Sequence, residues 1–560
     1  MSKFKLSFLK LPRVLSKLEK RLVVILSLVA LVAAGFWLYQ YYVNHTVVSP
    51  KVGGSYIEGV LGQPKFINPI IAQPSTVDMD LVTLIYSPLF KYNPKNELVN
   101  DLAESYTISE DNLTVTITLR TDVTWHDGTP FKADDVVYTV QSIQNPNLQS
   151  PLKSTFSNVT VAKGDDRTVI FTLAEPFAPF LSNLTFGILP KHLWEKVEPA
   201  NFPLTELNLQ PVGTGPFQFA EFKKDKLGEI KSYKVKRNPD YYLQRVNLQD
   251  ITFNFYPTRA ELAEALYLKK IEGLPYDSET AEAVVSADKL NEYQFLLPRY
   301  NAVFLNYAQN KDLEEKNVRS AMDMSIDLKA LKDILPPGAQ LIAGPILENF
   351  IGYNPDLSRP EFNFDEAHKL LHEAGWNEVD DEGLRTKNGK RLSFTLLVSD
   401  FPEHQVVADF LITAWKNIGL DANWESLSPA DIQARIRERN YDAILFGQVT
   451  GHDPDPYPFW HSTQREDPGL NLTAAKNKDI DKLLEDARQT NNPEDRVAKY
   501  KEFQSLLLNE HIAIFLYSPS YHYAVADKVK GIEPGVITNP SERFADVATW
   551  YIKTERVKKQ

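Results

Sequence analysis

Cysteine is absent from this chain of 560 residues. Disulfides, thiolate metal sites, cysteine nucleophiles and the acylated cysteine of a lipoprotein anchor are therefore excluded. The sequence also lacks a G-x-S-x-G nucleophile elbow, an H-E-x-x-H metal motif and a Walker lysine loop. These absences argue against ATP chemistry and against a standard hydrolase, and we expect neither an enzyme nor a cofactor.

The chain also lacks an excess of basic residues, because the formal net charge is −12 although the first residues are basic. A nucleic-acid partner would need clustered Lys and Arg to meet the phosphates, so none is expected. The composition, with 43% hydrophobic and 11% aromatic residues, indicates an ordered globular body. A chain of this length exceeds one ordinary hydrophobic core, so two or three lobes are predicted.

The one long run without charge occupies residues 22–43, and Lys and Arg dominate the segment before it. A helix needs about 20 apolar residues to cross a bilayer, and a positive flank favours the cytoplasmic side. We therefore expect a cytoplasmic tail at 1–21, a single-pass membrane anchor at 22–43, a linker at 44–54 and an extracytoplasmic body. A cleaved signal peptide is the alternative, with Val32-Ala33-Ala34 as a weak cleavage site. Aromatic residues at 37–42 favour the anchor, since such residues gather where helices leave the bilayer.

Strand and helix patterns alternate along the body. Residues 113–119 alternate apolar and polar side chains, as a half-buried strand does, and residues 133–143 place apolar side chains on one helical face. Residues 497–507 form a second clear amphipathic helix. This mixture predicts an α/β fold in several lobes.

Residues 451–461, GHDPDPYPFWH, concentrate carboxylates, imidazoles and aromatic rings in a loop that three prolines stiffen. One interpretation is a metal site of His452, Asp453, Asp455 and His461. Another is a rigid surface loop whose Phe459 and Trp460 pack into the core. A third is a ligand loop, in which a carboxylate meets a cationic group between aromatic walls.

Several segments, in order and spacing, resemble the family 5 extracellular solute-binding proteins, the oligopeptide- and dipeptide-binding receptors of ABC importers. They are LIYSPLF at 84–90, NDLAESY at 100–106, WHDGTP at 125–130, ADDVVY at 133–138, GTGPF at 213–217, RNPDYY at 237–242, VRSAM at 318–322 and DEAHKLL at 365–371. The resemblance covers about residues 56–551. It implies a two-lobed periplasmic-binding-protein-like α/β fold with an inserted subdomain, and hinge crossings near Asn301 and Tyr523. Lobe I would take 55–88, 214–300 and 525–552, the insertion 89–213, and lobe II 301–524.

The resemblance also implies a monomer that captures a peptide between its lobes and delivers it to ABC permease subunits. An extended peptide would pair with backbone strands of both lobes. The matching residues, with Trp460 as an aromatic wall, are Lys65, Phe66 and Asn68 in lobe I and Gly447, Gln448, Val449 and Thr450 in lobe II. The aspartate that holds the peptide's ammonium group would be Asp453, or else Asp455, and His452 can occupy the same place because this loop is one residue longer than in the dipeptide-binding type. A metal chelate, haem, opine or oligosaccharide ligand, or a sensory receptor without a transporter, remain alternatives on the same fold.

Overall fold

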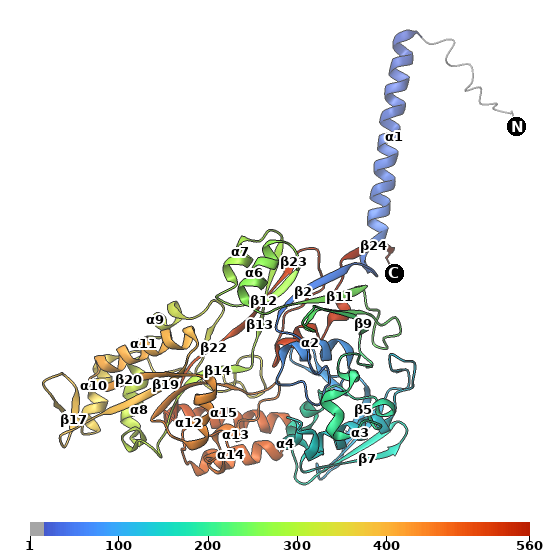
Figure 1. Ribbon diagram of the computed structural model, residues 1–560. Coiled ribbons are helices and arrows are strands. Elements are labelled where there is room, and N and C mark those ends of the chain that lie inside the picture. The colour runs from blue at the N-terminus through green and yellow to red at the C-terminus, as the bar shows by residue number, and fades with distance from the viewer. Residues whose placement is uncertain (1–15, 560) are drawn as a thin grey trace.

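The computed structural model describes residues 16–559. Most of the expected cytoplasmic tail, residues 1–15, lies outside the described residues. Helix α1 (Lys17–His45) begins at a capping box formed by Ser16 and Glu19, and none of its residues is buried. It is long and apolar enough to cross a membrane. Figure 1 shows it projecting away from the body of the protein.

The expected linker after this helix is largely a strand. Strand β1 (Thr46–Lys51) pairs antiparallel with the last strand, β24 (Lys553–Lys558), over six residue pairs from Thr46↔Lys558 to Lys51↔Lys553. Arg556 of β24 reinforces the junction, because its Nε donates to Thr46 Oγ1 at 2.9 Å and its Nη2 to the carbonyl of Val43 at 3.2 Å. The β-branched residues of β1 suit an extended backbone, and the C-terminal strand supplies its hydrogen-bond partner. Helix α1 is thus attached to the body through β1, which follows it, and through β24, which pairs with β1.

Lobe I is built on a seven-stranded sheet in the order β13-β23-β12-β2-β11-β10-β9. Helix α2 (Thr76–Ile85) and the pair α6 (Arg259–Tyr267) and α7 (Ala281–Ser286) flank the sheet. The strands are β2 (Ser55–Leu61), β9 (Phe217–Lys224), β10 (Ile230–Arg237), β11 (Asp250–Tyr256), β12 (Gly273–Tyr276), β13 (Leu290–Leu296) and β23 (Ser520–Ala526).

The Gly213-Thr214-Gly215 segment packs against the end of α2. A Cβ on Gly213 would lie 1.9 Å from the carbonyl oxygen of Ile85, and one on Gly215 would lie 2.6 Å from the carbonyl oxygen of Leu84. Gly215 also donates its N–H to the carbonyl of Ile85 at 2.8 Å. The two glycines therefore permit close backbone contact at this point.

The inserted subdomain shares one continuous hydrophobic core with lobe I. Its four-stranded antiparallel sheet runs β5-β6-β8-β7 beside the small pair β3-β4. In β6, Val115, Ile117 and Leu119 are buried while the threonines between them are half-exposed, which confirms the predicted alternation. The elements are β3 (Phe90–Tyr92), β4 (Leu98–Asn100), β5 (Ala103–Ile108), β6 (Thr114–Leu119), β7 (Val159–Asp165), β8 (Thr168–Leu173), α3 (Ala133–Gln144), α4 (Lys153–Phe156) and α5 (Lys191–Trp194).

Lobe II has its own core around a six-stranded sheet in the order β15-β22-β14-β21-β19-β20. Its sheet strands are β14 (Arg299–Leu305), β15 (Gln340–Leu341), β19 (Ser393–Ser399), β20 (Asp421–Leu427), β21 (Ala443–Val449) and β22 (Ala513–Ser518), and β16 (Glu378–Val379), β17 (Arg385–Lys387) and β18 (Lys390–Arg391) form a small separate sheet. Its helices are α8 (Lys316–Met324), α9 (Leu328–Ile334), α10 (Phe364–Glu373), α11 (Pro402–Asn417), α12 (Pro429–Glu438), α13 (Tyr457–Trp460), α14 (Lys478–Gln489) and α15 (Pro493–Asn509).

The chain passes between the two large sheets at two prolines. Pro298 lies between β13 of lobe I and β14 of lobe II, and Pro519 lies between β22 of lobe II and β23 of lobe I. Both crossings come a few residues before the expected positions at Asn301 and Tyr523, so β14 and β23 begin earlier than the expected lobe boundaries. Proline has no N–H for a sheet ladder, and this is a physical reason for the strands to end there.

Candidate functional site

The loop after β21 is where lobe II meets the other two parts of the molecule. His452 stacks on Tyr92 of the insertion, with ring centroids 4.0 Å apart. Its Nδ1 lies 2.7 Å from Oδ1 of Asn96, also in the insertion, and its Nε2 lies 2.8 Å from Oε2 of Glu542 in lobe I. Arg488 of α14 adds a second bridge, because its guanidinium lies 5.0 Å from the ring centre of Phe177 in the insertion. The structure is therefore a closed form, with lobe II in contact across the cleft.

A cavity of about 610 Å³ lies between this loop and the insertion. This volume is within the range of small-molecule binding pockets. Four of the predicted ligand residues line it, namely Thr450, His452, Asp453 and Asp455. The facing wall includes Tyr92, Phe177, Asn183 and the end of β8, and Arg488 lines the cavity from α14.

Asp453 does not stand free in this cavity. Its two carboxylate oxygens accept hydrogen bonds from both Nη atoms of Arg496 on α15, at 2.9 and 2.6 Å. Arg496 is buried and also contacts the hydroxyl of Tyr500, which donates to the carbonyl of Pro454 at 3.0 Å. This network fixes the loop, and the carboxylate keeps lone pairs that the arginine does not use.

Asp455 is paired in the same manner, with Nη2 of Arg488 2.8 Å from its Oδ2. Burial raises the pKa of the Asp455 carboxyl, although Arg488 acts in the opposite direction. The guanidinium of Arg488 lies 4.4 Å from the ring centre of Tyr457, so two aromatic faces enclose it together with Phe177. Each aspartate of the loop therefore has an arginine of its own.

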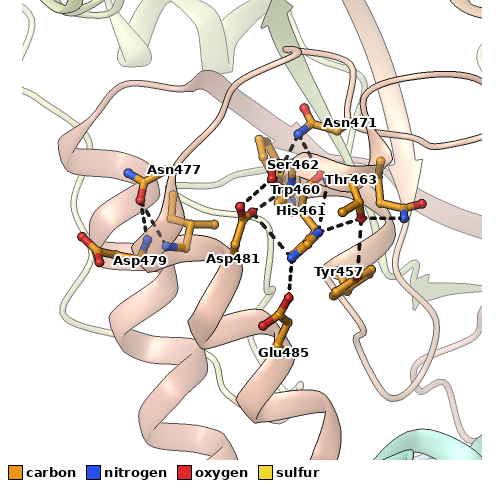
Figure 2. Close-up of polar contacts among 12 residues, drawn as sticks. Tyr457, Trp460, His461, Ser462, Thr463, Asn471, Asn477, Asp479, Asp481 and Glu485 are labelled. Carbon is orange, nitrogen blue, oxygen red and sulfur yellow. Dashed lines mark hydrogen bonds and ion pairs between the residues drawn. The ribbon is translucent and has the colours of Figure 1, made fainter. Parts of the chain in front are cut away.

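The two histidines of the loop are directed to different places, which does not fit the metal interpretation. His461 is buried and faces α14, where its Nε2 lies 3.1 Å from Oε1 of Glu485 (Figure 2). Its Nδ1 lies 2.8 Å from Oγ1 of Thr463, two residues further along the chain. His452 faces Asn96 and Glu542 instead. Within residues 16–559, no group of three His, Asp or Glu side chains is arranged to hold a metal ion.

Among the residues that the structure describes, the end of β21 has one strand edge without a partner. On one side the whole strand pairs with β14, from Ala443↔Leu305 to Val449↔Arg299. On the other side, the pairing with β19 is confined to Ala443 and Ile444. Gly447 is half-buried and Val449 is 50% exposed. This edge can accept an added strand at the position expected for a ligand backbone.

Other expected residues serve the interior. The side chain of Gln448 is buried, accepts from the Tyr300 hydroxyl and donates to the Leu470 carbonyl at 3.2 Å. Thr450 donates its N–H to the carbonyl of Pro298 at 2.8 Å, which ties the strand to the hinge. Trp460, expected as an aromatic wall, is 4% exposed and packs on Phe304 and Phe515 in the core of lobe II, as the rigid-loop interpretation expected.

The lobe I segment 65–68 uses its N–H groups within lobe I and toward the insertion. Lys65 and Phe66 donate to Asp78 Oδ1 at 2.7 and 3.0 Å, and Ile67 donates to the carbonyl of Asn208 at 3.0 Å. Asn68 is fully buried, and its Oδ1 accepts from the N–H of Ile70. The carbonyls of Phe66 and Asn68 already accept backbone N–H groups nearby. Among the described residues, the carbonyls of Lys65 and Ile67 are therefore the groups that this segment can still offer to a ligand backbone.

Sequence reasoning missed five residues of the site: Tyr92, Asn96, Arg488, Arg496 and Glu542. They come from the insertion, from two helices of lobe II and from the C-terminal part of lobe I, far from the loop in sequence. Arg488 and Arg496 carry no local motif that links them to Asp455 and Asp453. The signal that could have found them is indirect, since two half-buried aspartates in one rigid loop call for cationic partners.

The fold and the inter-lobe cavity define a two-lobed binding protein, and comparisons with known proteins agree. The sequence profile of bacterial extracellular solute-binding proteins, family 5 Middle, matches residues 97–469. The chain is 26% identical to the oligopeptide-binding protein AppA of Bacillus subtilis over 518 residues, covering 90% of this chain and 92% of that one.

Two solved structures extend the likeness to three dimensions. AppA of Bacillus subtilis in complex with a nonapeptide has a TM-score of 0.69 and 25% identity, covering 90% of this chain and 100% of that chain. NikZ of Campylobacter jejuni in complex with Ni(L-His) has a TM-score of 0.71 and 26% identity, covering 89% and 99%. The chain belongs to solute-binding protein family 5. It is an extracytoplasmic solute-binding protein of the kind that serves ABC importers, and this family is not enzymatic.

Proposed function

We propose that this protein captures peptides between its two lobes and delivers them to the permease of an ABC importer. The observation that carries the proposal is the unpartnered edge of β21, which leads directly into the cavity lined by Asp453. A strand edge pairs with the backbone of any extended peptide, whatever its side chains. A carboxylate at the end of that edge offers a partner for the peptide's ammonium group.

The pairing of Asp453 with Arg496 is compatible with this role. An ionised carboxylate has about four lone-pair positions, and a bidentate arginine occupies two of them. The arginine also holds the carboxylate in one orientation before the ligand arrives, which lowers the ordering cost of binding. Relatives on the same fold bind other solutes, as the Ni(L-His) complex of NikZ illustrates. A small chelate is therefore the second candidate, and His452 in the cavity wall is the side chain that favours it.

We further propose that α1 remains attached and anchors the protein in the membrane. Its exposed apolar surface needs an apolar environment, and the stacked rings of Trp37 and Tyr41 lie at the end that faces the body. The β1–β24 ladder then holds lobe I close to the bilayer, where a permease would receive the ligand.

The experiment is a titration of the full chain, in detergent, with a mixture of short unmodified peptides. Ligand that binds only the folded protein stabilises it by about 2.7 kcal/mol at a hundredfold excess over the dissociation constant. We expect a higher melting temperature with the peptides and no change with the same peptides after N-acetylation. Stabilisation by a nickel–histidine chelate but by no peptide would overturn the proposal in favour of the second candidate.

A further inference from the structure

Arg299, the first residue of β14, carries a positive charge that no ion pair balances within residues 16–559. Its side chain forms no hydrogen bond there either, and its Nε is enclosed by protein. The two arginines of the ligand loop differ in this respect, since Arg496 is paired with Asp453 and Arg488 with Asp455. An arginine that is partly removed from water is favourable only with an anion beside it, so Arg299 indicates where a ligand anion would bind.

Gly447 allows this arginine to lie across β21. In the β14–β21 pairing, Arg299 is opposite Val449 and Asn301 is opposite Gly447, and these positions share one face of the sheet. A Cβ on Gly447 would lie 2.6 Å from Nε of Arg299 and 2.9 Å from its Nη2. The guanidinium group therefore occupies the space above Gly447, on the part of β21 whose outer edge has no strand partner in the described chain. A peptide strand added at that edge would lie about 4.8 Å from β21, beside the guanidinium group.

The side chain of Asn301 leaves the outer nitrogens of Arg299 available. Asn301 is buried, and its Oδ1 would lie 2.8 Å from the same Cβ position on Gly447. This oxygen has no hydrogen-bond partner among the described residues. It can accept the Nε proton of Arg299, and both Nη groups then remain for an anion.

The first turn of α11 adds positive potential at this place. Burial lowers the pKa of His404 in that turn, and the nearby charge of Arg299 lowers it further, so the arginine approaches the N-terminal end of the helix. The partial positive charge of a helix N-terminus favours an anion there. Glu403 of the same turn is exposed and is not paired with Arg299 in the described part of the chain.

We propose that Arg299 binds the C-terminal carboxylate of the captured peptide at the free edge of β21. This inference rests on the peptide-binding function proposed above and adds the group that recognises the second end of the ligand. A peptide paired antiparallel to β21 extends from Asp453, beyond the C-terminal end of the strand, back toward Gly447. Its ammonium group meets Asp453 and its carboxylate meets Arg299, which selects short peptides with both termini free. Arginine suits this task, because its planar guanidinium group donates two parallel hydrogen bonds to a carboxylate.

A chemical change in the peptide tests this assignment without altering the protein. The full chain in detergent is titrated by calorimetry with a short peptide that contains no Asp or Glu, so that its C-terminus is its only carboxylate, and with the same peptide after C-amidation. We expect amidation to weaken binding at least about tenfold, because the charge-assisted hydrogen bonds to Arg299 are lost. Equal affinities would overturn the inference and leave peptide capture itself intact. Binding of neither peptide would contradict the proposed function, and this inference with it.

Three variants locate the effect in the protein. Arg299→Gln should bind both peptides equally, with about the affinity of the wild type for the amide. Gly447→Ala keeps the arginine but places a Cβ where the guanidinium group lies, so this variant should also lose the distinction between the two peptides. Arg437→Gln is the matched control, because Arg437 is an exposed arginine on α12 of the same lobe and its loss changes the net charge equally.

We expect Arg437→Gln to keep the wild-type ratio of the two affinities. The same ratio in Arg299→Gln would overturn the assignment, as would a comparable loss of the ratio in Arg437→Gln. If Arg299→Gln does not fold, Gly447→Ala decides the matter together with the wild type, because its clash involves a flexible side chain that can move aside.

Discussion

Asp453, which lines the inter-lobe cavity, forms a bidentate ion pair with Arg496, with nitrogen–oxygen distances of 2.9 and 2.6 Å. Arg496 comes from α15, so the pair joins the ligand loop to the helical layer of lobe II. The arginine side chain is 6% exposed and the aspartate side chain 18%. Because Arg496 fixes its orientation, the Asp453 carboxylate is held ready to accept hydrogen bonds from a cationic group.

Asp453→Asn is expected to weaken peptide binding more than a hundredfold. Removing one partner of a buried charge pair typically costs about 3–5 kcal/mol, because the remaining charge is left uncompensated. Calorimetric titration of the variant with an unmodified peptide measures the loss. The wild type should bind the N-acetylated form of that peptide poorly, a result that does not depend on how the variant folds.

Asp455→Asn is the matched control, because it removes the other arginine-paired aspartate of the same loop. We expect it to leave peptide affinity nearly unchanged. If Asp455→Asn is the damaging change, the register of the ligand loop is displaced by two residues. If neither substitution matters and acetylated peptides bind normally, the ligand is not held by its amine.

Gly213→Ala is expected to destabilise the protein by about 3 kcal/mol, since overpacking against backbone cannot be relieved by a rotamer change. Its Cβ would lie 1.9 Å from the carbonyl oxygen of Ile85. Gly344→Ala is the control, because its nearest neighbour would be Cδ1 of Leu357 at 3.3 Å. Urea unfolding of both variants measures the difference, and equal midpoints would contradict the close packing described here.

His126 should make the protein less stable in acid. Its Nδ1 accepts the N–H of Gly213 at 3.2 Å and its Nε2 donates to the carbonyl of Gly215 at 3.1 Å, so the neutral ring satisfies both partners. Burial lowers the pKa of His126 to about 4. The unfolded chain takes up the proton near pH 6.5, so the contribution is complete above that pH and is lost as pH falls toward the folded value, by roughly 3 kcal/mol.

Unfolding free energies of the wild type and of His126→Gln, measured from about pH 7 to 4, isolate this contribution because the other titrating groups are shared. We expect the gap between the two proteins to narrow as the pH falls. A constant gap would show that His126 is not kept neutral by the fold.

The membrane anchor predicts an intact N-terminus. Mass spectrometry of the protein extracted from membranes should find the helix still attached. A mature chain that begins at or near Gly35 would show instead that the helix is a signal peptide. The β1–β24 ladder would survive such cleavage, so a folded body does not by itself distinguish the two.

Much of the fold was predictable because its signals are local or carried by the family resemblance. The alternation in β6 and the buried face of α3, with Ala133, Val136, Val140 and Ile143, follow from periodicity alone. The β1–β24 ladder was not predictable, because its strands lie at opposite ends of the chain and neither has a strong pattern. The two crossings between the lobes lie a few residues before the expected positions at Asn301 and Tyr523 for a related reason. Where a strand begins depends on which sheet it joins, and this is not a local property of the sequence.

The site was predictable only in part. The position of the loop and its rigidity follow from three prolines and the family resemblance. The arginine partners of Asp453 and Asp455 and the contacts of His452 depend on tertiary packing between distant segments, for which one sequence contains no signal. Trp460 illustrates the limit: an aromatic residue beside a ligand loop is compatible with both a cleft wall and a core, and here it lies in the core.

Native mass spectrometry of the full chain, purified in mild detergent without added ligand, tests most directly whether the protein binds peptides. We expect one or more populations heavier than the apoprotein, whose excess masses dissociate on activation and fragment as short peptides with free amino termini. An excess mass that belongs to a metal chelate, haem or another non-peptide solute, or a ligand-free protein that takes up no mass from a peptide mixture, would contradict it.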